Sequence, residues 1–93
     1  MPMYMVIERF KAGSSTAVYE RFQTKGRMLP PGLCYIDSWL RADDTTCYQL
    51  MKTDDPKTFD KWIAHWDDLV EFEVQKLKTK PIKRFDDLPN QSM

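Results

Sequence analysis

Few residues of this chain have the types and spacing that enzymatic chemistry needs. His65 is the only histidine, and histidine is the residue type that most often acts as a general base or metal ligand near neutral pH. On a helical wheel it lies at the flank of an apolar stripe, so a surface position, a place in a pocket and metal or haem ligation all stay open. A zinc site needs about four ligands, and the chain offers neither a second histidine nor a C-x-x-C pair, so we expect no metal site.

The two cysteines, Cys34 and Cys47, are expected to be free thiols. They fall in two predicted strands that form a hairpin, and a turn centred on residues 43–44 places Cys34 opposite Thr53. The same register places Cys47 opposite Leu40, so the cysteines lie about six residues apart, or roughly 20 Å at ~3.3 Å per residue. A disulfide needs Cα atoms within about 7 Å.

Aromatic side chains are abundant for so short a chain, with three Trp, four Tyr and five Phe. Such residues usually form a core, but apolar walls with a few convergent polar groups also make a small-molecule site. The candidate ligand-binding residues are Arg9, Tyr35, Trp39, Tyr48, Trp62 and Trp66.

Several polar residues lie inside predicted strands, where charge is costly unless it is paired or hydrated. They are Glu8, Arg9, Asp37, Ser38, Gln49, Glu71 and Glu73. Arg9 shares a strand face with Met5 and Ile7, so we expect it to pair with Glu71 or Glu73 of a neighbouring strand. An anion-binding role for Arg9 is the alternative.

Hydrophobic periodicity defines the elements that must position these residues. It predicts a strand over 3–10, a helix over 15–25, strands over 33–40 and 46–53, a helix beginning at 54–56 and a strand over 70–77. The second helix has the clearest apolar stripe, formed by Phe59, Trp62, Ile63 and Trp66 at i, i+3, i+4 and i+7.

The order βαββαβ with right-handed crossovers predicts a ferredoxin-like α+β fold. Its four-stranded antiparallel sheet has the strand order 4-1-3-2, with both helices on one face. We expect this domain to span residues 1–78 and an irregular tail to span 79–93. Because both sheet faces are apolar and two helices cover one, we predict a homodimer packed through its sheet faces, a dimeric α/β barrel in which the tail can contact the partner.

Charge and hydropathy exclude several classes of partner. Fourteen basic residues balance fourteen acidic ones, so nothing favours nucleic acid or an anionic membrane, both of which attract clustered positive charge. The first ten residues lack the features of a signal peptide, and no apolar stretch approaches the roughly 20 residues that span a bilayer. We therefore expect a cytoplasmic protein.

Four segments together resemble one known family. They are MVIERF in the first strand, GRMLPPGLCYIDSW in the loop and second strand, CYQLM in the third strand, and WIAHWDDLVEFEV in the second helix and fourth strand. The resemblance, from about Met3 to Leu77, is to a bacterial family of short, functionally uncharacterised proteins in the dimeric α/β-barrel superfamily. It implies the ferredoxin-like fold and the dimer. The wider superfamily includes cofactor-independent monooxygenases, haem-degrading and haem-binding enzymes, muconolactone-isomerase-like proteins and stress-response proteins, and fold alone does not choose among them.

Three hypotheses of function follow. The first is a homodimer that binds a small apolar or aromatic molecule without a cofactor. The second is a cofactor-independent monooxygenase of a polycyclic phenol, in which a tryptophan and either His65 or Asp37 assist proton removal. The third is a structural or interaction module whose aromatic residues are all core. An enclosed cavity lined by polar groups favours the first two, whereas a filled core favours the third.

Overall fold

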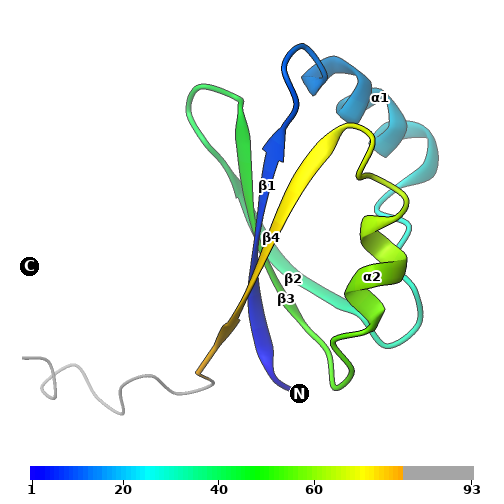
Figure 1. The fold of residues 1–93 in the computed structure, drawn as a ribbon, viewed down its shortest axis with the longest axis vertical. Helices are drawn as coiled ribbons and strands as arrows, with labels where there is room; N and C mark the ends of the chain where they lie inside the picture. The colour runs from blue at the N-terminus through cyan, green and yellow to red at the C-terminus, as the bar shows by residue number, and fades with distance from the viewer. Residues whose placement is uncertain (79–93) are drawn as a thin grey trace, which may run out of the picture.

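The computed structural model describes residues 1–78, so the predicted tail of residues 79–93, with any partner contact, lies outside the described residues. Six elements follow one another in the predicted βαββαβ order (Figure 1). They are β1 (Met3–Phe10), α1 (Ser15–Lys25), β2 (Cys34–Leu40), β3 (Thr46–Lys52), α2 (Thr58–Ile63) and β4 (Val70–Leu77).

The strands form one antiparallel sheet in the order β2-β3-β1-β4. This is the predicted order read from the opposite edge. Both helices lie on the same side of the sheet, so no helix of residues 1–78 covers the other side (Figure 1). The ferredoxin-like α+β fold is therefore confirmed.

Helix α1 has the predicted bounds. It ends at Gly26, whose φ of 65° lies in the left-handed region that favours glycine. Ser14 occupies the N-cap position, but its hydroxyl donates to the carbonyl oxygens of Lys11 and Leu69 rather than capping the helix. Only Val18 of the helix is buried, while Tyr19 and Phe22 stay 43% and 40% exposed. Helix α1 therefore contributes one buried side chain to the core and leaves two aromatic rings largely accessible.

Helix α2 begins later than predicted, at Thr58. The chain turns through residues 56–57 first, where Asp55 Oδ1 accepts a hydrogen bond from the main-chain nitrogen of Lys57. The expected apolar stripe nevertheless faces the sheet. Phe59, Trp62 and Trp66 are all buried, although Trp66 lies in the turn that follows the helix.

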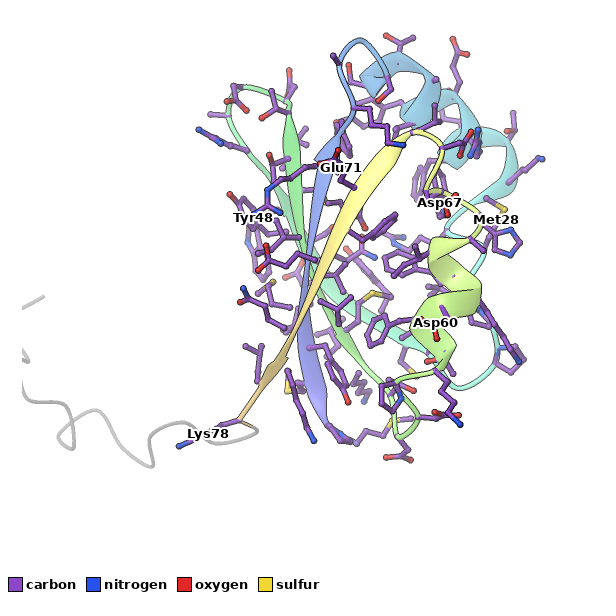
Figure 2. All side chains as sticks on the ribbon, in the orientation of Figure 1. Met28, Tyr48, Asp60, Asp67, Glu71 and Lys78 are labelled. Carbon is purple, nitrogen blue, oxygen red and sulfur yellow. The ribbon has the colours of Figure 1, made fainter. Side chains whose placement is uncertain are left out.

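The two faces of the sheet differ in their cover. The face toward the helices carries Tyr4, Val6, Met51 and Val70, which belong to the core. The opposite face, called the open face below, carries a row across three strands that joins Trp39, Tyr48 and Ile7. Figure 2 shows the Tyr48 side chain on the side away from the helices.

A β-bulge in β2 corrects the predicted hairpin register. Leu40 lies opposite Cys47 and Trp39 opposite Tyr48, as expected, but the register shifts by one residue between Tyr35 and Asp37. One extra residue in a strand reverses the faces of the side chains on its two sides relative to each other. Tyr35, which lies before the bulge, therefore faces the helices, whereas Trp39, which lies after it, faces the other way.

The same shift places Cys34 opposite Lys52 rather than Thr53. Cys47 keeps its predicted position at the far end of the hairpin. Both thiols are free, which confirms the prediction.

Neither helix of residues 1–78 is long and apolar enough to cross a membrane.

Candidate functional site

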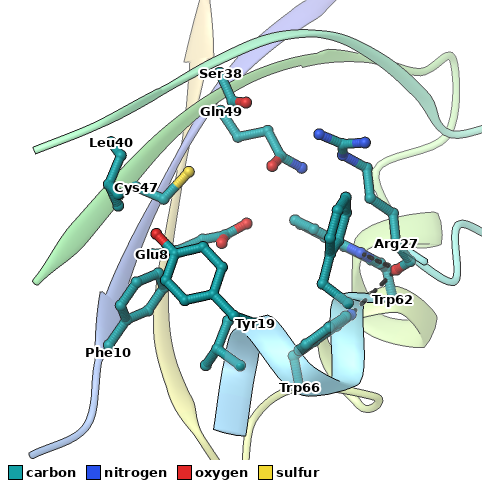
Figure 3. Close-up of a pocket in the computed structure, with 12 residues that line it drawn as sticks. Glu8, Phe10, Tyr19, Arg27, Ser38, Leu40, Cys47, Gln49, Trp62 and Trp66 are labelled. Carbon is teal, nitrogen blue, oxygen red and sulfur yellow. Dashed lines mark hydrogen bonds between the residues drawn. The ribbon is translucent and has the colours of Figure 1, made fainter. Parts of the chain in front are cut away.

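A cavity of about 310 Å³ lies between α1, α2 with the turn after it, and strands β1, β2 and β3 (Figure 3). Its apolar lining residues are Phe10, Val18, Tyr19, Phe22, Leu40, Trp62 and Trp66. Its polar lining residues are Glu8, Arg27, Ser38, Cys47 and Gln49. The volume falls at the lower end of the ~300–1,000 Å³ of small-molecule pockets.

The two tryptophans are fixed by a shared hydrogen-bond acceptor. The Nε1 atoms of Trp62 and Trp66 donate to the carbonyl oxygen of Arg27 over 3.0 and 3.1 Å. One carbonyl thus satisfies both buried N–H groups. The rings of Trp62 and Phe72 also pack in a T-shaped arrangement, with 5.3 Å between their centroids. The tryptophan wall of the cavity is therefore held in one arrangement.

The position of α1 over the cavity is set by Arg21. Its two terminal nitrogens donate to the two carboxylate oxygens of Asp68 over 2.8 Å each, and one also donates to the carbonyl of His65. The hydrogen bonds from Arg21 lower the pKa of Asp68 to about 2. The bidentate geometry fixes orientation, so α1 is tied to the turn after α2.

Glu8 places a carboxyl group in this apolar space. It shares the face toward the helices with Tyr4, Val6 and Phe10, which lie at every second position of β1. Burial raises its pKa from 4.5 to about 7, although the positive charge of Arg27 acts in the opposite direction. Within residues 1–78 no hydrogen bond to this carboxyl contributes to the shift. Glu8 therefore changes charge near neutral pH beside an open cavity.

The other polar groups on the sheet are not nucleophiles. Burial and the neighbouring Glu8 raise the pKa of the Cys47 thiol to about 11, so the thiolate is scarce at neutral pH. The Gln49 amide donates to the sulfur of Met51, and the Ser38 hydroxyl bonds to the Tyr35 hydroxyl over 2.7 Å. These groups can hydrogen-bond a ligand but do not suit covalent catalysis.

Arg27 reaches the cavity from the loop after α1. Its Cζ lies 3.6 Å from the Tyr35 ring centroid and 5.0 Å from that of Phe22. Its Nε is buried and has no hydrogen-bond partner among residues 1–78. In Figure 3 Arg27 and Gln49 lie across the cavity from Phe10 and Tyr19. The cavity thus has polar groups on opposite sides, because Glu8 and Cys47 lie beside Phe10 and Tyr19 (Figure 3).

The structure brings together only part of the predicted ligand-binding set. Trp62 and Trp66 line the cavity, and Tyr35 lies just behind it, stacked on Arg27. Trp39 and Tyr48 lie on the open face, away from the cavity.

Arg9 also lies on the open face rather than in the cavity. It forms the predicted ion pair there, with its Nη2 3.0 Å from Glu73 Oε1. This confirms the pairing of neighbouring strands. Both side chains are substantially exposed, so the pair contributes little to stability.

The two candidate proton acceptors are both outside the cavity. His65 is exposed in the turn after α2, where only its main-chain carbonyl contacts Arg21. Asp37 is exposed on β2 and accepts a hydrogen bond from the main-chain nitrogen of Ser38. No cluster of three or more potential metal ligands occurs in the part of the chain that the structure describes.

Glu8 and Arg27 are the two charged lining residues of the cavity, and neither was among the predicted ligand-binding residues. Glu8 carried a usable signal, because a charged residue at period two among Tyr4, Val6 and Phe10 must face the core. Arg27 carried none. It sits in a loop whose path depends on Met28, which has a positive φ of 59°.

Residues 2–77 match the model of a protein family described as "Domain of unknown function (DUF3303)". A search of curated proteins finds no match.

Proposed function

Because the chain belongs to the DUF3303 family, whose description assigns no activity, we propose a function from the cavity: the protein binds a small aromatic molecule between α1 and the sheet. The observation that carries this proposal is the space of about 310 Å³ whose walls combine fixed indole rings with the partly buried Glu8 carboxyl. Small-molecule sites combine apolar walls with a few polar groups in the same way.

The exposure of Tyr19 and Phe22 supports the same proposal. Both residues line the cavity from α1, yet each keeps about two-fifths of its surface accessible. Leu40 is 42% exposed across the opening on β2. A bound aromatic ring would remove this apolar surface from water, at about 25 cal/mol for each Å² buried.

Filling the mouth of the cavity should weaken the binding of an aromatic ligand. We expect the wild-type protein to bind 2-naphthalenemethanol in isothermal titration calorimetry, and Leu40→Trp to weaken the affinity at least about tenfold, because the larger ring occupies the opening. Ala17→Trp, which adds the same ring to an exposed position of α1 outside the cavity, is the control. Equal affinity in both variants would locate the binding elsewhere. A wild-type protein that binds neither this alcohol nor its anionic and cationic analogues would refute the proposal.

The open face supports a second proposal, that the protein works as a homodimer. The row Trp39–Tyr48–Ile7 runs across three strands, and the neighbouring row adds Leu50 and Met5. Trp39 is 51% exposed. A second copy carries the same apolar rows, so a two-fold axis between the two sheets would pack these rows against each other.

Sedimentation at micromolar concentration should therefore give about twice the chain mass of 11.1 kDa. Trp39→Glu should shift the protein to the monomer, since it places two charges in the interface. Thr16→Glu, which adds the same charge to an exposed position of α1, should leave the dimer intact. A wild-type monomer would exclude packing through the open face.

A further inference from the structure

We infer that the ligand is an aromatic carboxylic acid bound as its anion, with the carboxylate on the guanidinium of Arg27 and the ring between the tryptophans and α1. This inference rests on the proposed function and adds the charge of the ligand. It depends on three features of the cavity: the unpaired Arg27, the aromatic rings that hold it and the protonation of Glu8.

The first feature is that Arg27 has no carboxylate partner among residues 1–78. Arg27 forms no ion pair with the carboxylates of residues 1–78, although four ion pairs occur elsewhere in that range. Its Nε is also buried and has no hydrogen-bond partner in the same range of residues. A buried donor left unsatisfied destabilises the fold, and the charge increases that cost. A bound carboxylate would supply the missing acceptor.

The second feature is the orientation of the guanidinium. Tyr35 and Phe22 lie against the guanidinium group, at 3.6 and 5.0 Å between Cζ and the ring centroids. Stacked rings occupy the faces of the planar group and leave its N–H edge for hydrogen bonds. The Tyr35 hydroxyl is itself held by Ser38. Arg27 is therefore preorganised for a planar, bidentate acceptor such as a carboxylate.

The third feature is the only carboxyl group among the cavity's lining residues. The groups that face Glu8 are Arg27 from the loop, Cys47 from β3 and the Tyr19 ring from α1. Burial outweighs the attraction of Arg27 and raises the pKa of Glu8 to about 7. Below that pH Glu8 is neutral, so Arg27 leaves a net positive charge in the cavity. That charge favours an anion over a cation.

Three probes with one ring system test the sign of the ligand charge. They are 2-naphthoate, the neutral 2-naphthalenemethanol and the cationic 2-naphthylmethylammonium, each titrated calorimetrically into the full chain at pH 6. We expect naphthoate to bind about tenfold more tightly than the alcohol, and the cation most weakly, because a hydrogen-bonded ion pair strengthens binding by about this factor. Equal affinities, or tightest binding of the alcohol or the cation, would overturn the inference but leave the proposed function standing. Failure of all three probes to bind would refute both.

Two substitutions assign the preference to Arg27. Arg27→Met should abolish the preference for naphthoate over the alcohol, while Arg27→Lys should retain part of it through the charge alone. Arg41→Met removes a positive charge from the β2–β3 turn, outside the cavity, and should change nothing. A preference that survives Arg27→Met in a folded protein would contradict the inference. If Arg27→Met fails to fold, the Lys variant and the wild-type ranking still decide it.

The affinity for naphthoate should also fall several-fold from pH 6 to pH 8, because Glu8 becomes negative in that range and repels the anion. The probe itself stays ionised throughout, since carboxylic acids have pKa values near ~4. Glu8→Gln should remove this pH dependence. A pH dependence unchanged in Glu8→Gln would place the anion away from Arg27 and Glu8.

Discussion

Trp62→Ala and Trp66→Ala should each reduce the free energy of unfolding by about 3–5 kcal/mol, which is much of the roughly 5–15 kcal/mol available to a small domain. Trp62 is 2% exposed and Trp66 is 6% exposed. Each variant loses both the buried ring and the hydrogen bond to the Arg27 carbonyl. Thermal melts should shift downward by roughly 15 °C or more for a domain of this size.

Phenylalanine variants at the same positions separate the two contributions. Trp62→Phe and Trp66→Phe keep a buried ring and lose the N–H donor, so we expect a smaller loss, about 1–2 kcal/mol each. The Arg27 carbonyl keeps one indole partner in either single variant. Wild-type-like melts of both alanine variants would mean that this stripe does not form the core.

Glu8→Gln should be more stable than wild type above pH 7 and equally stable near pH 4. The pKa of Glu8 rises from 4.5 to about 7 on folding. Between these pH values the native state binds more protons than the unfolded state, so wild-type stability falls as pH rises and levels off above pH 7. At about 1.4 kcal/mol per pH unit, the loss reaches at most about 3 kcal/mol.

Urea unfolding at several pH values measures this difference. Glu73→Gln is the control with the opposite sign, because hydrogen bonds from Gln75 and Arg9 lower the pKa of Glu73. The stabilisation that Glu73 gives the native state is complete above the pKa of this carboxyl in the unfolded chain, and it is lost as pH falls. Parallel curves of stability against pH for wild type and Glu8→Gln would show that Glu8 is not buried.

Local patterns were enough to predict most of the fold. Strand β1, helix α1 and strand β4 have the predicted bounds, because runs of β-branched and aromatic residues mark the strands, and Ser14 and Gly26 mark the ends of α1. Element order and the right-handed crossover rule then left one sheet topology. The stripe of Phe59, Trp62 and Trp66 is buried as expected.

The bulge in β2 could not be predicted in the same way. No glycine marks Ile36, and the shift arises from pairing with β3 across the sheet. One inserted residue moved Tyr35 to the face of the helices, where it stacks on Arg27. A single-residue change of register therefore separated residues that the sequence had grouped, with Tyr35 behind the cavity and Trp39 on the open face.

The sequence by itself determined the fold, the free cysteines and the burial of Trp62 and Trp66, because each depends on local periodicity or on pairing between neighbouring strands. Only the tertiary structure decided the site. Glu8 and Arg27 are 19 residues apart in the chain, and they line one cavity because the fold places the loop after α1 beside the sheet. The charge state of Glu8 depends on how far the packed elements around it exclude water, and no local pattern of residues encodes that.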